Sequence, residues 1–312
     1  MGKDQSSFVS SHRRPERTPR ARGFTALFSA LAIAVSANGW AAARAGAAQR
    51  SGAHQHRVPA AARAAAPGRV EILRLPSGDA DGAPREVWVY RPPGRDSSAV
   101  PVVYFLHGYP GSDRDGEGVG LADRLDREFA AGADPFVLVV PSGQSSIYPD
   151  SEWADSADGR LRLEHFVVST LVRAVEGRHR RHRANRAIAG FSMGGYGAMN
   201  LAVRHRHLFG QVVSIAGYFH PDDPDRVGGG EPRWWDGNSP DRHVARARRT
   251  RVLLVEAAEE RSSLIKGEAG RFAQLARKAG LRPTLLVAPG GHNWSMVVDE
   301  IPAVVRHLES GW

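Results

Sequence analysis

The 312-residue sequence contains no cysteine. This absence excludes a disulfide framework, a thiolate metal site and a cysteine nucleophile. Lysine is scarce as well, because Lys3, Lys266 and Lys278 are the only ones, and arginine carries nearly all of the positive charge. With 42% hydrophobic and 24% charged residues, the composition is otherwise that of a globular protein, which excludes wholesale disorder and collagen-like structure.

The positive charge is concentrated near the amino terminus. The formal net charge is +9, and residues 1–66 hold ten basic residues against Asp4 and Glu16, which leaves +1 for residues 67–312. Nucleic-acid binding needs a basic surface, so we expect no nucleic-acid partner. The densest remaining basic run, from His179 to Arg183, is typical of a solvated helix end.

Residues 1–47 have the three-part order of a secretory signal. A basic stretch from Arg13 to Arg22 precedes the apolar run 24–35, and small residues follow at 41–43 and 45–47, where cleavage would occur. The apolar run is short for a membrane span, although an uncleaved anchor is the alternative. We therefore expect a secreted protein without stable membrane association after cleavage. Residues 48–68 lack apolar periodicity and are expected to be a flexible linker.

From residue 69 onward, short β-rich runs alternate with helical patterns. Two opening strands precede the strand–helix alternation, which predicts a single α/β domain over 69–312, with a mainly parallel central sheet and helices on both faces. The expected strands are 70–75, 86–90, 101–106, 136–140, 187–190, 211–214, 252–255 and 284–288. The expected helices are 121–131, 161–177, 193–205, 268–279 and a closing segment that must kink or restart at Pro302.

Residues 218–249 interrupt this alternation. The segment is rich in Pro, Gly, Asp and Trp and shows neither a strand nor a helix period. A loop of this length in a compact domain is usually functional, often as a lid over a site. Its Trp234 and Trp235 are candidate substrate-binding residues that could stack on a sugar or an aromatic acyl group, or alternatively could pin the segment to the core.

A candidate nucleophile lies where a buried strand ends and a helix begins. The segment Gly190-Phe191-Ser192-Met193-Gly194 matches the pattern G-x-S-x-G, which is weak alone but gains weight from this strand–turn–helix context. The turn would hold the serine in strained geometry, with Oγ above the sheet at the positive end of the following helix. The alternative is a glycine-rich turn of purely structural purpose.

A serine hydroxyl needs a base, and the base needs an orienting acid. His292 follows the last expected strand on a glycine-rich loop, and the chain order serine, acid, histidine is satisfied. The acid should follow strand 252–255, where Glu256 is too early to reach over to His292. Loop length favours Glu260 over Glu259, and the alternative for each is a solvated charge at a helix cap.

The loop after the third expected strand would supply part of an oxyanion hole. In such a hole two main-chain N–H groups bind the developing negative charge. We expect them to come from Tyr109, in the segment Leu106-His-Gly-Tyr, and from Met193, the residue after the nucleophile. His107 in the same segment is expected to be architectural rather than a base.

From about residue 70 to 312 the sequence resembles the putative esterase family of α/β-hydrolases. That family includes esterase D-like S-formylglutathione hydrolases, feruloyl esterases and mycolyltransferases of the antigen 85 type. The likeness is most specific over residues 186–199 (RAIAGFSMGGYGAM) and continues through 207–210, 213–217, 237–240 and 290–294. The sequence departs from the family pattern at 257–260, where Ala-Ala-Glu-Glu stands in place of a Gly-x-x-Asp-like turn.

The resemblance implies an α/β-hydrolase fold and a serine carboxylesterase that needs no metal or other cofactor. We expect an acyl-enzyme mechanism on a Ser192–His292–Glu260 triad, and an ester substrate that is a small molecule or is linked to a polysaccharide. Two alternatives remain open, namely acyl transfer to an extracellular sugar acceptor and a secreted binding protein with a vestigial triad.

Overall fold

The computed structural model describes residues 66–94, 96–178 and 180–312. The expected signal peptide (1–47) and all but the last three residues of the expected linker (48–68) lie outside the described residues.

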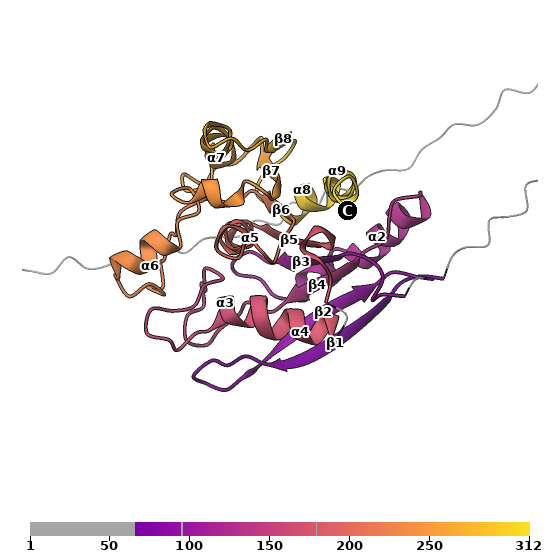
Figure 1. Ribbon diagram of the computed structural model, residues 1–312, viewed down its shortest axis with the longest axis horizontal. Helices are drawn as coiled ribbons and strands as arrows, with labels where there is room; N and C mark the ends of the chain where they lie inside the picture. Colours follow the sequence, from indigo (N-terminus) through magenta and orange to yellow (C-terminus); the bar gives the residue numbers. More distant parts are fainter. Residues whose placement is uncertain (1–65, 95, 179) are drawn as a thin grey trace, which may run out of the picture. The chain divides into compact units, whose positions relative to one another are not determined.

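The described strands form one eight-stranded sheet (Figure 1). The order is β1-β2-β4-β3-β5-β6-β7-β8, in which β1, β2 and β4 pair antiparallel and all other neighbours pair parallel. The mainly parallel sheet expected from the sequence is confirmed. The strands are β1 (Arg69–Pro76), β2 (Pro84–Arg91), β3 (Val102–Leu106), β4 (Val137–Pro141), β5 (Arg186–Phe191), β6 (Gln211–Ile215), β7 (Arg251–Ala257) and β8 (Thr284–Ala288).

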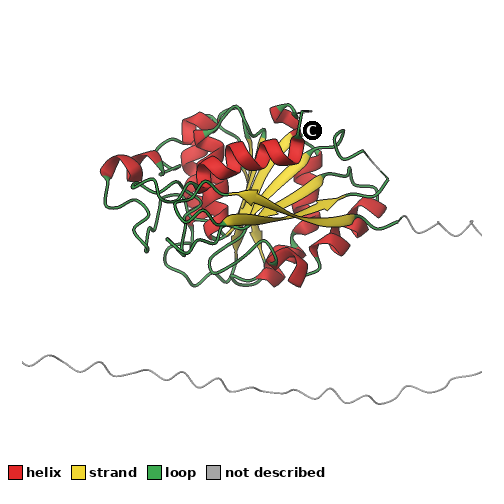
Figure 2. Cartoon of the chain, turned by 90° about the horizontal axis from the view of Figure 1, so that it is seen from below, coloured by secondary structure: helices red, strands yellow, loops and turns green. Residues whose placement is uncertain are grey.

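Helices cover both faces of the sheet (Figure 2). The central strands are apolar throughout because alternate residues meet different layers: Tyr104 of β3 belongs to the apolar cluster that includes residues of α3, α4, α5 and α7, whereas Phe105 belongs to the cluster that includes residues of α2, α8 and α9. The helices are α1 (Asp115–Gly118), α2 (Leu121–Ala130), α3 (Leu163–His165), α4 (Val172–Glu176), α5 (Met193–Arg204), α6 (Pro232–Gly237), α7 (Glu268–Lys278), α8 (Trp294–Asp299) and α9 (Ile301–Glu309).

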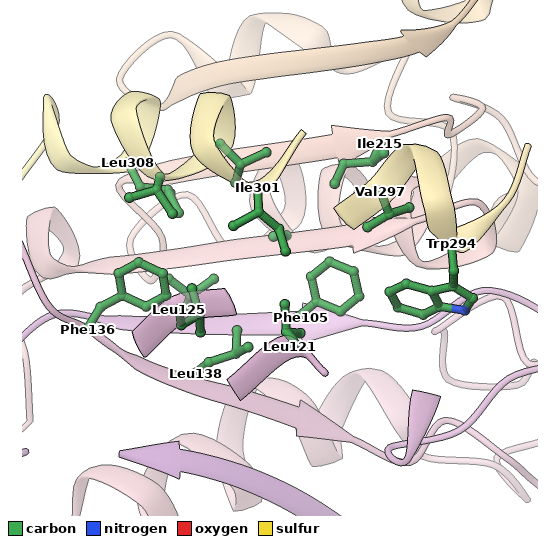
Figure 3. A pocket seen from close by; sticks show the side chains of 14 residues that line it. Phe105, Leu121, Leu125, Phe136, Leu138, Ile215, Trp294, Val297, Ile301 and Leu308 are labelled. Carbon is green, nitrogen blue, oxygen red and sulfur yellow. The ribbon is translucent and has the colours of Figure 1, made fainter. Parts of the chain in front are cut away.

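A small apolar gap remains between the sheet and the layer of α2, α8 and α9. Its volume is about 50 Å³, and its lining includes Phe105, Leu125, Val297 and Ile301, with Trp294 at one end (Figure 3). Such a small apolar gap is a packing void of the core, since it offers a water molecule no polar partner.

Two local expectations were wrong or incomplete. The expected helix 161–177 begins at Leu163, and its middle turns, Phe166–Leu171, run as a π-helix between α3 and α4. Segment 218–249 contains the short helix α6 and the 3₁₀ turn Val244–Ala247, although we expected no helix there. The expectation for the closing segment is confirmed, because it restarts at α9 with Pro302 in the first turn, where the missing N–H removes no helical hydrogen bond.

The basic run near residue 180 is not a simple solvated helix end. The Arg181 guanidinium donates to the carbonyl oxygens of Val100 and Ser97, and that of Arg183 donates to the carbonyl oxygen of Phe209. Both side chains are half-buried. These two arginines tie loops at the amino-terminal edge of the parallel strands, whereas Arg180 of the same run is exposed.

Candidate active site

Ser192 stands in the turn between β5 and α5, in a backbone conformation that favours glycine. Its φ is 58° and its ψ is −122°, a combination that costs a non-glycine residue free energy and persists only when the surroundings enforce it. The Ser192 N–H donates to the carbonyl oxygen of Ile215 (2.9 Å), and its carbonyl oxygen accepts from Tyr196 N–H (3.1 Å). The serine is thereby fixed at the amino-terminal end of a twelve-residue helix, where the partial positive charge of the helix stabilises an anion.

The flanking glycines are explained by close approach of neighbouring chains. A methyl group at Gly190 would overlap the carbonyl of Gly194, and one at Gly194 would overlap the carbonyl of Leu106 at the end of β3. A methyl group at Gly108 would lie 3.0 Å from Cβ of Ser192. The turn can therefore form only with glycine at 190 and 194, and the loop after β3 lies directly against the serine.

His292 connects Ser192 to a buried carboxylate. Its Nε2 lies 2.9 Å from Oγ of Ser192, and its Nδ1 lies 2.6 Å from Oε2 of Glu260. The Glu260 side chain is 3% exposed, and its Oε1 accepts from the N–H groups of Arg261 and Ser262, both at 2.9 Å. The carboxylate is thus held by two main-chain donors on one oxygen and presents the other to the imidazole.

The neighbouring glutamates do not take this position. Glu259 is exposed, and Glu256 accepts from the N–H groups of Gly267 and Gly270, at the start of α7. Of the three candidates the structure therefore brings only Glu260 to His292.

The loop that carries His292 is fixed on both sides. Glu259 N–H donates to the carbonyl oxygen of Gly290 (2.9 Å), which links the loop after β7 to the loop after β8. The imidazole packs on the ring of Phe191, with 4.7 Å between ring centroids. Trp294 packs on Phe191. It also packs on Phe105, which lies beside it in Figure 3. This aromatic packing limits the directions in which the imidazole can move.

The loop after β3 and the turn at Ser192 each leave one main-chain N–H group without a hydrogen-bond acceptor in the described part of the chain. Neither Tyr109 N–H nor Met193 N–H has an acceptor among the residues that the structure describes. His107 is buried, accepts from Gly143 N–H at Nε2 (2.8 Å), and donates from Nδ1 to the carbonyl oxygen of Gly108 (2.8 Å). Burial lowers the pKa of His107, so this ring is neutral and architectural.

A cleft of about 310 Å³ adjoins this loop. Its lining residues are His107, Tyr109, Pro110, Gly111, Gln144, Ser145, Pro149 and Met193. No carboxylate, lysine or arginine side chain occurs among these described lining residues, and half of the Tyr109 surface is exposed at the rim. The cleft is therefore an uncharged surface formed in part by the loop after β3 and by Met193, the residue that follows Ser192.

Sequence reasoning missed two residues that support the site. Glu152 and Trp153 are fully buried, and both have a φ of 50°, which is unusual for non-glycine residues. The Trp153 indole N–H donates to the carbonyl oxygen of His107 (3.0 Å). The Glu152 carboxyl group accepts from the N–H of Asp223 and the hydroxyl of Tyr218, both at 2.9 Å. In the sequence, only the presence of a tryptophan in a loop could have indicated these two residues, because strained φ angles produce no periodic pattern.

Glu152 gives a testable dependence of stability on pH. Burial raises its pKa to about 8, so the folded state keeps this proton in a range where the unfolded chain has lost it. Glu152 therefore lowers the unfolding free energy progressively from about pH 4.5 to pH 8, by an amount on the order of 4 kcal/mol. In Glu152→Gln, whose amide can satisfy the same partners, this decline is expected to disappear.

The measurement is urea unfolding of both proteins between pH 5 and pH 9. The neighbouring Asp150, with a pKa raised by burial to about 6, is present in both proteins, so its own titration contributes to both curves, while its charge helps to raise the Glu152 pKa. A wild-type stability that follows that of Glu152→Gln at every pH would contradict the prediction.

The two tryptophans of α6 do not line the cleft that adjoins the loop after β3. Trp234 lines a separate hollow of about 320 Å³ together with Glu164, Arg204 and His205, and its indole N–H donates to the carbonyl oxygen of Asp155 (2.7 Å). Trp235 packs against it at a ring-centroid distance of 6.2 Å. Arg204 is the last residue of α5, and Ser192 precedes the first residue of that helix. The structure therefore does not bring Trp234 and Trp235 to Ser192. The role of the two tryptophans in substrate binding stays a prediction.

The described residues contain no group of three or more His, Cys, Asp or Glu side chains that could hold a metal ion. None of the helices in the described part of the chain is both long and apolar enough to cross a membrane. A hydroxyl, an imidazole and a carboxylate connected in series can make the hydroxyl oxygen a nucleophile and can then deliver its proton to a leaving group.

Comparison with known proteins agrees with this chemistry. The sequence profile of the family described as "Putative esterase" matches residues 79–307. A comparison with curated proteins gave no match. Among solved structures, a ferulic acid esterase superposes with a TM-score of 0.69 at 23% identity, over 79% of this chain and 99% of that one.

Two further structures show the same fold. An S-formylglutathione hydrolase from Agrobacterium tumefaciens has a TM-score of 0.64 at 17% identity, over 78% of this chain and 96% of its own. MPT51 (FbpC1) from Mycobacterium tuberculosis has a TM-score of 0.62 at 19% identity, over 78% and 98%. At such low identities these likenesses show the α/β-hydrolase fold alone.

Proposed function

The chain belongs to the putative esterase family, a group of serine hydrolases, and from this membership we propose that it cleaves carboxylic esters through an acyl-enzyme on Ser192. The observation that carries the proposal is the series of contacts from Ser192 Oγ to His292 Nε2 (2.9 Å) and from His292 Nδ1 to Glu260 Oε2 (2.6 Å). Each group needed for nucleophilic catalysis is within hydrogen-bonding reach of the next.

In the first half-reaction His292 takes the proton of Ser192 as Oγ attacks the ester carbonyl carbon. The N–H groups of Tyr109 and Met193 bind the oxyanion of the tetrahedral intermediate. His292 then gives its proton to the alcohol oxygen as the C–O bond breaks. Glu260 keeps the Nδ1 proton in place and stabilises the imidazolium. A water molecule repeats these steps on the acyl-enzyme and releases the carboxylic acid, so that no cofactor is required.

The lining of the cleft favours substrates with neutral acyl groups. Because no ionic side chain lines it in the described part of the chain, an anionic acyl group would lose its hydration without gaining a partner. Tyr109 and the two prolines of the lining, Pro110 and Pro149, present apolar surface instead. The substrates we propose are therefore uncharged esters, either small or linked to a polysaccharide.

Turnover of a series of nitrophenyl esters of increasing acyl length tests this function. We expect release of nitrophenol and stoichiometric labelling of Ser192 by a fluorophosphonate probe. Analysis of the products in the presence of a sugar acceptor separates hydrolysis from acyl transfer, since free acid is expected to predominate. A protein that neither turns over any ester nor reacts with the probe would contradict an enzymatic role.

We also propose that the protein is exported, on the sequence pattern of residues 1–47. The expected result is a mature chain in the culture medium that begins near residue 44 or 48. Amino-terminal sequencing measures this, and a full-length chain recovered only with membranes would favour the uncleaved anchor.

A further inference from the structure

The buried indole of Trp153 holds the loop after β3. Its N–H group donates to the carbonyl oxygen of His107 (3.0 Å), and the two rings pack edge to face with 5.0 Å between their centroids. The next peptide unit along the chain carries the N–H group of Tyr109, which the mechanism above assigns to the oxyanion. Trp153 therefore fixes the peptide unit directly before this donor.

Trp153 is tightly packed and lies apart from the cleft. A methyl group at Gly143 would lie 2.6 Å from Cζ2 of the indole, and one at Gly197 of α5 would lie 2.5 Å from Cβ of Trp153. Gly143 N–H also donates to Nε2 of His107 (2.8 Å). Trp153 is fully buried and is absent from the lining of the cleft. It can therefore act on the loop after β3, but it does not touch a molecule bound in the cleft.

The carboxyl group of Glu152 fixes the backbone on which Trp153 stands. Both residues have a φ of 50°, a conformation that persists only when the surroundings enforce it. Oε1 of Glu152 accepts from the N–H groups of Asp222 (3.0 Å) and Asp223 (2.9 Å), and Oε2 accepts from the hydroxyl of Tyr218 (2.9 Å). These three bonds connect the strained turn to the segment after β6.

The environment of Glu152 favours its neutral form. Burial raises the pKa of this carboxyl group to about 8, and the charge of Asp150 acts in the same direction. An ionised Glu152 would be a buried charge without a cationic partner among the described residues, and opening of the turn to water would relieve that cost. The titratable residues that face it are Asp150, Asp222, Asp223, Tyr218 and, from α5, Tyr196.

We propose that Trp153 is a positioning residue of the oxyanion hole, which directs the N–H group of Tyr109 through the His107 carbonyl, and that Glu152 keeps Trp153 in place. The inference rests on the esterase function proposed above and extends it to residues that touch no reacting atom. Because the oxyanion forms only as the reaction proceeds, a well-placed N–H group accelerates the chemical step without strengthening substrate binding. Displacement of this donor should lower kcat and leave KM unchanged.

The test is Trp153→Phe, which keeps a buried aromatic ring and removes the N–H donor. We expect kcat for a nitrophenyl ester to fall about ten-fold, less than the roughly 10²- to 10³-fold effect of losing an oxyanion donor outright, with KM within two-fold of wild type. The inhibition constant of phenylboronic acid should rise by the same factor as kcat falls. In that adduct Ser192 Oγ bonds to boron, its proton passes to His292, and a boronate oxygen takes the place of the oxyanion.

The matched control is Trp88→Phe in β2. Trp88 is 1% exposed, and its indole N–H has no hydrogen-bond partner among the described residues, so this variant shrinks a buried ring without removing a bond. It should keep the wild-type kcat and inhibition constant. If a folded Trp153→Phe protein matched Trp88→Phe in both constants, the inference would be overturned and the esterase would stand. Failure of wild type to turn over any ester would instead overturn the function itself.

A second measurement keeps the inference testable if Trp153→Phe does not fold. The kcat of wild type is compared with that of Glu152→Gln from pH 6 to pH 9, with folding checked by near-ultraviolet circular dichroism. Above pH 8 Glu152 ionises in the folded protein, whereas the glutamine amide stays neutral. We expect the ratio of wild-type to variant kcat to fall about five-fold between pH 7 and pH 9, at unchanged KM. A ratio that is constant with pH would overturn the role of Glu152 in holding Trp153.

Discussion

Replacing Ser192 with alanine is expected to lower kcat for a nitrophenyl ester by about 10⁴-fold or more, with little change in KM. The change removes the only oxygen within hydrogen-bonding distance of His292 Nε2 in the described residues. Attack would then fall to a water molecule, which the proposed oxyanion donors, the N–H groups of Tyr109 and Met193, would assist only weakly. Stopped-flow measurement of the nitrophenol burst checks this, because the variant should lose the burst along with steady turnover.

The matched control for this variant is Ser98→Ala, which changes an exposed serine outside the site and should keep wild-type kcat. Ser192→Ala should also be at least as stable as wild type, since alanine at 192 leaves the Ser192–Ile215 main-chain contact in place. Turnover that persists within ten-fold of wild type in a folded Ser192→Ala protein would show that another residue is the nucleophile.

The sequence was sufficient for the parts of the site that depend on local spacing. Gly190 and Gly194 lie two residues on either side of Ser192, at the end of an apolar strand, and the structure shows that both are required by close chain contacts. His292 follows the last strand, and loop length alone favoured Glu260, which is the glutamate that the structure brings to His292. The order of strands and helices was also readable, because each strand is a short apolar run between turn residues.

The parts that sequence reasoning did not give depend on contacts between distant segments. Glu152 is buried because Asp222 and Asp223, about 70 positions later, supply N–H donors to its carboxyl group. No pattern in the sequence of a polar loop predicts such burial. A hollow at the carboxyl end of β4 likewise arises where the loops after β3 and β4 meet Arg85 of β2. Helix α6 is six residues long, too short for its period to be recognised. Tertiary packing, rather than propensity, decides such features.

The acid of the site allows the sharpest test, because two adjacent glutamates differ in one property. Glu260→Gln is expected to lower kcat by about 10³- to 10⁴-fold, whereas Glu259→Gln, which alters an exposed side chain, should stay within two-fold of wild type. The reason is the tautomer of His292. In the variant, Oε1 of the new amide would still accept from Arg261 and Ser262, so its NH₂ group would face the imidazole.

That NH₂ group can only donate, and Nδ1 of His292 would then have to accept. The ring proton would move to Nε2, the atom that lies 2.9 Å from Ser192 Oγ, and Nε2 could no longer take the serine proton. KM should change little because Glu260 is buried behind the imidazole and does not line the cleft. Steady-state kinetics of the two variants on one nitrophenyl ester measures the difference. If Glu260→Gln and Glu259→Gln had equal activities, the Glu260 carboxylate would only anchor its loop. Such a structural role does not depend on which nitrogen of His292 carries the proton.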